Sequence, residues 1–297
     1  MDKLKALQTV VHIAELGSLT AAAAAQGQSL PAVVRQLAAL EAQLGVRLFQ
    51  RSTRRVALTA DGRSYLARAR DILAAVADAD ASLQAGQATV QGPLCVTAPV
   101  LFGEQHVAAL VAQFALQYPG VDLRLLLLDR FVNLVDEGVD VAIRIGELED
   151  SSLIAQRLGA VRHCVVASPA WLRRHGTPTH PDALRTLECI SYTDEAHGDW
   201  LFQDGGRRLR VPARGRLRFN HPGAALQACL AGAGVGLFLH YQVADALAQR
   251  RLRLLLPGWE RPPQPVHWVL PQARQRPARV QAFLDLITPA LRAVLAG

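Results

Sequence analysis

Residues 18–55 most constrain the fold of this chain, because two short helical patterns and a basic hairpin pattern follow one another there. The second helical pattern opens with Ser29-Leu30-Pro31, a serine that can cap a helix and a proline in the first turn, where a missing backbone N–H is tolerated. Apolar residues then recur at helical spacing, at Val33, Leu37, Leu40 and Leu44. This spacing predicts a helix with one buried face, whose opening residues are free to meet another molecule.

A shorter, alanine-rich pattern precedes this helix. It begins at Ser18, which can cap a helix, and it stops at Gly27. Two short helices joined by Gly27-Gln28 form a helix-turn-helix. The apolar anchors of a hairpin follow at residues 48–58, and its tip carries Arg51, Arg54 and Arg55. The order predicts a winged helix-turn-helix, a motif that places its second helix in a DNA groove.

The charge distribution agrees with a polyanionic partner. The 297-residue chain has a formal net charge of +7, which alone is mild evidence. Residues 35–70 hold eight arginines but only two acidic residues, Glu41 and Asp61. An ordinary solvated surface is the alternative, but arginines beside a groove-entering motif favour phosphate contact.

These motifs resemble the N-terminal domain of the LysR-type transcriptional regulators. The matching stretches are Leu16-Gly17-Ser18-Leu19-Thr20-Ala21-Ala22-Ala23, Pro31-Ala32-Val33, Arg35-Gln36-Leu37, Leu44-Gly45-Val46-Arg47-Leu48-Phe49-Gln50-Arg51 and Leu58-Thr59-Ala60-Asp61-Gly62. The resemblance implies that the second helix enters the major groove of double-stranded DNA and that the wing reaches the minor groove. The implied DNA-binding residues are Ser18, Thr20, Leu30, Pro31, Val34, Arg35, Arg51, Arg54 and Arg55.

Two of these positions depart from the family pattern. The family usually has polar residues where Leu30 and Val34 stand. Apolar side chains there can touch thymine methyl groups, whereas Arg35 can make two hydrogen bonds to a guanine edge. We therefore expect an altered base preference; weaker, less selective binding is the alternative.

A single long helix is predicted from Thr59 to about Ala88. Its seam residues recur at spacings of three and four: Leu66, Ala69, Leu73, Val76, Asp80 and Leu83. Such a seam is typical of a coiled coil with a second subunit, although packing on its own domain is the alternative. The resemblance implies a dimerising linker helix and a homodimer or homotetramer.

Beyond a break at residues 86–93 the pattern alternates between strands and helices, which predicts a parallel sheet with helical crossovers. This α/β half resembles the family's effector-binding region, which is itself like the periplasmic binding proteins. The matching stretches include Asp140-Val141-Ala142-Ile143-Arg144-Ile145-Gly146, Ala167-Ser168-Pro169-Ala170-Trp171-Leu172 and Gly232-Ala233-Gly234-Val235-Gly236. We expect a DNA-binding domain (1–58), a linker helix (59–89) and an effector domain (90–297). In the last, subdomain I combines 92–161 with 267–297 and subdomain II is 162–266.

Small molecules bind beyond the carboxyl ends of strands in open α/β sheets. The candidate effector-binding residues at such ends are Thr97, Val100, Leu101, Phe102, Ile145, Gly146, Asn220, His221, Phe238 and His240. They suit a small apolar or aromatic molecule, and an acid held by helix N-termini is one option. Each histidine could instead serve only in packing.

Other functional classes find little support in the sequence. It contains no GxSxG, HExxH, P-loop or GxGxxG motif, so neither an enzyme nor a cofactor site is expected. A solute-binding protein would need an export signal, and none is recognisable. The four cysteines, Cys95, Cys164, Cys189 and Cys229, are far apart, which favours buried thiols over a disulfide or metal site. The expectation is a cytoplasmic regulator that binds DNA in a sequence-specific way and responds to a small molecule.

Overall fold

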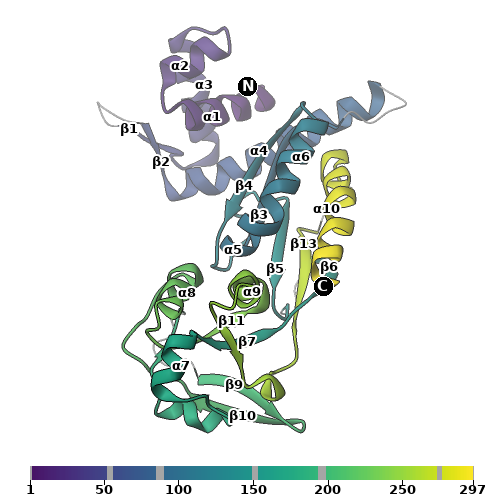
Figure 1. The fold of residues 1–297 in the computed structure, drawn as a ribbon. Helices are drawn as coiled ribbons and strands as arrows, with labels where there is room; N and C mark the ends of the chain where they lie inside the picture. Colours follow the sequence, from purple (N-terminus) through teal and green to yellow (C-terminus); the bar gives the residue numbers. More distant parts are fainter. Residues whose placement is uncertain are drawn as a thin grey trace.

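The computed structural model describes residues 2–51, 56–84, 90–148, 153–192, 199–272 and 276–296. The chain begins with three helices, α1 (Lys3–Leu16), α2 (Leu19–Ala25) and α3 (Leu30–Leu44), followed by the hairpin β1 (Phe49–Arg51) and β2 (Val56–Leu58) (Figure 1). Ser18 caps α2 through its hydroxyl, which accepts from the Ala21 N–H at 3.3 Å. Ser29 takes the capping position of α3, but its side chain makes no capping hydrogen bond.

The core of this N-terminal domain is formed by the inward faces of its helices. Val10 and Ile13 of α1 meet Val33, Leu37 and Leu40 of α3, all of them fully buried. Small side chains on α2 let the helices approach closely, because Ala22 and Ala23 lie in the same cluster. The apolar spacing of the sequence therefore selects which face of α3 is buried.

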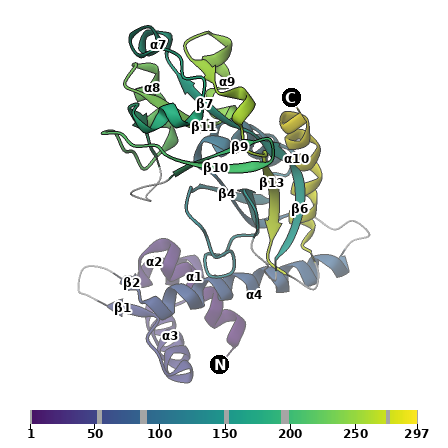
Figure 2. The same ribbon diagram turned by 90° about the horizontal axis from the view of Figure 1, so that it is seen from below.

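Helix α4 (Ala60–Gln84) links the two halves of the molecule (Figure 2). The Thr59 hydroxyl accepts from the Gly62 N–H at 2.9 Å and so caps the helix. Leu66 and Ala69 are buried, and Leu66 belongs to the N-terminal core, so the start of the expected seam packs on its own domain. The side chains of Asp80 and Leu83 lie outside the described residues.

Subdomain I is built on a five-stranded sheet with the order β4-β3-β5-β13-β6. Its strands are β3 (Gly92–Ala98), β4 (Val121–Leu127), β5 (Val141–Ile145), β6 (Ile154–Val161) and β13 (Gln264–Leu270). β3 runs parallel to β4 and β5, whereas β13 is antiparallel to β5 and β6. The helical segments are α5 (Val100–Phe102), the π-helical η1 (Gly103–Val107), α6 (Ala108–Gln117) and α10 (Ala278–Ala296). Side chains of α6 and α10 complete the core of this sheet.

Subdomain II has a four-stranded sheet with the order β12-β7-β11-β8. Its strands are β7 (His163–Ala167), β8 (Cys189–Ile190), β11 (Val235–Leu239) and β12 (Arg253–Leu255), and its helical segments are α7 (Pro169–His175), η2 (Pro181–Arg185), α8 (Pro222–Leu230), α9 (His240–Ala248) and η3 (Pro257–Trp259). A hairpin of β9 (Asp199–Asp204) and β10 (Arg207–Pro212) is paired separately. The chain crosses between the subdomains twice, from β6 to β7 and from β12 to β13 (Figure 1).

Three details differ from the sequence-based expectation. The sequence of residues 131–137 predicts a short helix between two strands, but the structure has a loop with turns there. The Asn133 side-chain oxygen accepts from the Val135 and Asp136 N–H groups and competes with helical bonding. The return strand β13 begins at Gln264, three residues before the expected boundary at 267. It pairs with β6, a strand that the sequence did not suggest.

Candidate functional sites

The first site is the exposed start of α3. Leu30, Pro31 and Arg35 are exposed and Val34 is half-buried, whereas Val33 and Leu37 on the opposite face are fully buried. The opening turns of α3 thus present the side chains that the sequence predicted to face bases. The arrangement can place one guanidinium and several apolar groups in a groove of DNA.

Polar contacts hold α3 in this position. The Thr9 hydroxyl of α1 lies 3.0 Å from the side-chain oxygens of both Gln26 and Gln36, so one buried group connects all three helices. At the other end of α3, one Glu41 carboxylate oxygen accepts from the N–H groups of Leu48 and Phe49 at 2.8 and 3.2 Å. Glu41 therefore holds the β1–β2 hairpin against α3, the helix expected to enter the DNA groove.

The remaining predicted DNA contacts are placed only in part. Thr20 is exposed, and the hydroxyl of half-buried Ser18 is used as a helix cap. Arg54 and Arg55 lie outside the described residues, as does the side chain of Arg51. The roles proposed for these arginines remain predictions.

The second site is a cavity of about 640 Å³ between the two subdomains. Subdomain I contributes the loop after β4 and the end of β5, and subdomain II contributes the starts of α8 and α9 with Tyr192. Its lining residues are Pro99, Leu128, Asp129, Arg130, Phe131, Arg144, Ile145, Tyr192, Asn220, Pro222, Leu239, Tyr241, Gln242 and Gln264. Of the ten residues expected at an effector site, Ile145 and Asn220 are among them.

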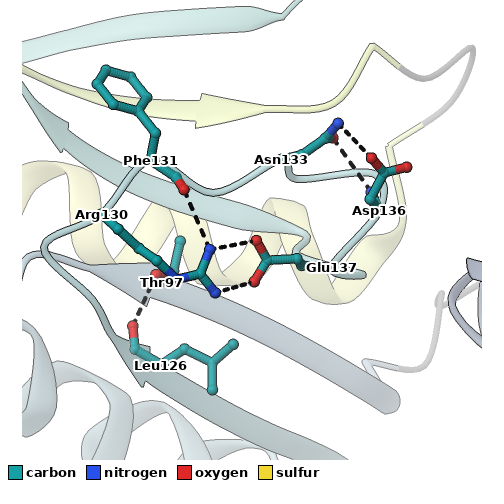
Figure 3. Close-up of polar contacts among 7 residues, drawn as sticks. All are labelled: Thr97, Leu126, Arg130, Phe131, Asn133, Asp136 and Glu137. Atoms are coloured by element: carbon teal, nitrogen blue, oxygen red, sulfur yellow. Dashed lines mark hydrogen bonds and ion pairs between the residues drawn. The ribbon is translucent and has the colours of Figure 1, made fainter. Parts of the chain in front are cut away.

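Three of the other candidates are buried and support the lining. Phe102 contacts Tyr241 edge-on at a centroid distance of 5.3 Å, and Phe238 stacks on Tyr192 at 5.5 Å. The Thr97 hydroxyl donates to the Leu126 carbonyl at 2.9 Å and is fully buried (Figure 3). These side chains do not line the cavity, because Phe102 and Phe238 belong to the hydrophobic cores of the two subdomains and Thr97 is fully buried.

The last five candidates are not among the residues that line the cavity. Val100, Leu101 and His240 are half-buried, and burial lowers the pKa of His240. The His221 ring nitrogen Nδ1 accepts from the Gly223 N–H at 3.1 Å and caps α8. Gly146 has a φ of +121°, a backbone conformation that favours glycine.

The prediction from sequence did not include the charged residues of the cavity wall. The Arg130 guanidinium donates two hydrogen bonds to the Glu137 carboxylate, at 2.7 and 2.6 Å (Figure 3). This pairing raises the pKa of Arg130 and lowers that of Glu137. Arg144 projects from β5, and burial lowers its pKa. Arg144 interrupts the otherwise apolar run at residues 141–145, and a charged residue in such a run was a usable signal for a side chain with a functional role.

Tyr192 and Tyr241 give the cavity two aromatic walls. Burial raises the pKa of both hydroxyls, that of Tyr192 to about 12, so they are neutral donors at ordinary pH. The Tyr241 hydroxyl accepts from the Gln242 amide at 3.3 Å. The walls can therefore hold a small ring or chain and hydrogen-bond its polar end.

The described part of the chain holds no group of three metal-ligating side chains and no helix that could cross a membrane. Cys164, Cys189 and Cys229 are buried free thiols, and Cys95 is a half-buried one.

Comparisons with known proteins match both halves. The sequence model described as "Bacterial regulatory helix-turn-helix protein, lysR family" matches residues 4–63, and "LysR substrate binding domain" matches residues 87–292. The chain is 36% identical to the regulator PtxR of Pseudomonas aeruginosa strain PAO1, covering 95% of this chain and 91% of PtxR. It is 34% identical to the repressor PA14_22550 of P. aeruginosa strain UCBPP-PA14, covering 97% and 92%.

A full-length structure shares the architecture. CrgA, described as a LysR-type transcriptional regulator from Neisseria meningitidis, superposes with a TM-score of 0.62 at 30% identity, covering 97% of this chain and 98% of CrgA. A helix-turn-helix domain followed by a substrate-binding-like domain thus occurs over nearly the whole length of this chain and of a protein of known class. The chain belongs to the LysR family of bacterial transcriptional regulators, which bind DNA and carry an effector-binding domain.

Proposed function

We propose that two copies of this chain, paired through α4, present their α3 helices to two half-sites of one operator. The single observation that carries this proposal is the division of α3 between a buried face and an exposed start that bears Arg35. In a dimer, two such helices can enter successive major grooves on one side of the duplex.

The pairing face of α4 is proposed to begin where its own domain ends. Ile72 is 47% exposed, although Leu66 and Ala69 just before it are buried in the N-terminal half. An exposed isoleucine on a long helix is better accommodated against a second subunit than in water. Assembly of two dimers into a tetramer remains an expectation from the family.

Binding of the chain's own promoter fragment tests the DNA half of the proposal. We expect Arg35→Ala to weaken binding and to reduce discrimination at one base pair by about 1–3 kcal/mol. The matched control, Arg173→Ala, changes an exposed arginine on α7 in subdomain II and should leave binding unaltered. Equal affinity of the Arg35 variant and the parent for the promoter and for a scrambled duplex would contradict base readout.

Sedimentation tests the pairing half. Ile72→Asp should shift the dimer toward monomer, because a carboxylate on the pairing face must be desolvated. A dimer that persists at the same concentration would place the interface elsewhere.

The cavity between the subdomains is the proposed effector site. A ligand that fits one spacing of the subdomains better than another shifts the balance between conformations, and so changes how the paired α3 helices meet DNA. We propose that the protein acts in the cytoplasm and has no enzymatic activity, as suits a regulator whose relatives are named transcriptional regulators.

A further inference from the structure

We propose that the cavity between the subdomains binds a small organic anion through Arg144 and Arg130, and that binding of the anion breaks the ion pair between Arg130 and Glu137. This inference rests on the proposed effector role of the cavity. It identifies the chemical class of the ligand and the ion pair that responds to it.

Arg144 is the first reason. Its Nη2 atom is buried and has no hydrogen-bond partner among the residues that the structure describes, and the side chain lines the cavity. A buried guanidinium nitrogen without an acceptor costs free energy, which an anionic ligand in the cavity would recover. Burial also lowers the pKa of Arg144, as expected for a cation that lacks a full counter-charge.

Arg130 and Glu137 are the second reason. Arg130 also lines the cavity, and its two hydrogen bonds to Glu137 satisfy one side of its guanidinium (Figure 3). Glu137 attracts Arg144 electrostatically while Arg130 repels it. Glu137 therefore interacts with two guanidinium groups, while the other carboxylate of the cavity wall, Asp129, accepts from the Val100 N–H. An anion between the two arginines would give them a further acceptor.

At each helix start beside the cavity, one backbone N–H group is already bonded to a side chain. The Asp129 carboxylate accepts from the Val100 N–H at 2.9 Å at the start of α5. The α8 start is capped by His221, and the Gln242 side chain accepts from the Leu239 N–H at 3.0 Å at the start of α9. The arginine side chains are thus the available partners for an acid.

The rest of the wall favours an apolar body on this anion. Phe131 is 89% exposed and lies beside Arg130 on the cavity wall. Leu128, Ile145 and Leu239 also line the cavity. A carboxylate with an aromatic or aliphatic body would cover this apolar surface and place its charge at the arginines.

The ion pair also reaches a second cavity. Glu137, Asp136 and Gly138 line a space of about 610 Å³ whose other wall includes Arg63 and Arg70 of α4. The loop after β4 extends toward α4 in Figure 2. A Glu137 carboxylate released from Arg130 would therefore face arginines of the linker helix, and the anion would alter the charge balance at the linker.

Matched acids and amides test the charge requirement. The full-length protein is titrated with benzoate and hexanoate, and with benzamide and hexanamide, at constant ionic strength, by calorimetry and thermal shift. We expect binding by at least one acid and by neither amide. No response to either acid, or an equal response to its amide, would overturn the inference.

Variants test the two arginines. Arg144→Gln should weaken binding of the acid by about tenfold or more, because a charge-assisted contact is lost. Arg144→Lys, which keeps the charge, should lose less, and Arg173→Gln is the exposed control. Unchanged affinity in Arg144→Gln would overturn the inference.

Glu137→Gln tests the exchange of partners. If the anion must displace Glu137 from Arg130, this variant should bind the acid several-fold more tightly. Unchanged or weaker binding would overturn the exchange. Binding of the promoter fragment without any anion is measured on the same samples, so an intact DNA response with no anion response would reject this inference and leave the proposed function standing.

Discussion

Gly62 of α4 lies so close to Leu48 that a Cβ atom on Gly62 would sit 2.0 Å from the Leu48 carbonyl oxygen. The same carbonyl accepts from the Thr59 N–H at 3.0 Å. The first turn of the linker helix is thus seated directly on the backbone that leads into the hairpin. Only glycine permits this contact, and it fixes the direction in which α4 leaves the DNA-binding domain.

Gly62→Ala should therefore destabilise the N-terminal domain. In an open helix this change stabilises by up to about 1 kcal/mol, but here the clash with backbone should reverse the sign and cost about 3 kcal/mol. Urea unfolding and promoter binding measure the effect. Gly258→Ala is the control, since none of the described residues comes within 4 Å of its added Cβ. Equal stability of the two variants would contradict the close contact.

Val34→Ser should change which base pairs the recognition helix prefers. Val34 is half-buried near the exposed start of α3, where it can meet a thymine methyl but cannot hydrogen-bond a base. Selection from a randomised duplex at fixed salt compares the variant with the parent. We expect the preference to move at one or two positions, with overall affinity altered far less. An unchanged preference would remove Val34 from the base-reading surface.

Arg144→Met should raise the stability of the ligand-free protein or leave it unchanged. The variant keeps an unbranched apolar chain and removes a buried nitrogen for which the described part of the chain offers no partner. Thermal unfolding without ligand measures this, and Arg279→Met supplies the contrast because the Arg279 Nε donates to the Pro93 carbonyl. A marked loss of stability in Arg144→Met would show that this guanidinium is structurally required.

Periodicity predicted those parts of the fold in which one face of an element is buried. The helices of the DNA-binding domain have this property. The parallel strands β3, β4 and β5 were predicted instead from short apolar runs that alternate with helices, and Val141, Ala142 and Ile143 of β5 are all buried. Strand β6 was missed because it carries Gln156, Arg157 and Gly159 and is held by its pairing with β13, more than a hundred residues away. The spacing of Leu66 and Ala69 predicted a buried face but could not identify its partner, which for Leu66 is the core of the chain's own N-terminal domain.

The cavity was predictable only at strand ends. Ile145 follows from the rule that ligands bind beyond the carboxyl ends of strands. Tyr192, Tyr241 and Gln264 line the cavity because two subdomains and a crossing strand come together there. A local sequence pattern cannot predict such a tertiary arrangement. The Arg130–Glu137 ion pair lies on a loop whose sequence is typical of a helix. The loop forms because the Asn133 side chain accepts from backbone N–H groups, and the sequence pattern did not predict this contact or the ion pair.

His163 makes the stability of subdomain II dependent on pH. Its ring is 7% exposed on β7, and the Arg261 Nε donates to its Nδ1 at 3.1 Å. Burial, reinforced by the charge of Arg261, lowers its pKa from 6.5 to about 3. At pH values between these two pKa values, the ring is protonated in the unfolded state but neutral in the folded state, so lowering the pH favours unfolding.

Protonation of His163 in the unfolded state should lower the free energy of unfolding by about 2 kcal/mol as the pH falls from 7 to 5. His163→Gln can still accept the Arg261 hydrogen bond but does not titrate, so its stability should fall less over this range. Urea unfolding of both proteins at pH 7, 6 and 5 compares the slopes. Residual dependence in the variant is expected, because burial also lowers the pKa of His106, His240 and His267. Parallel slopes for the two proteins would show that His163 takes up its proton equally in the folded and unfolded states.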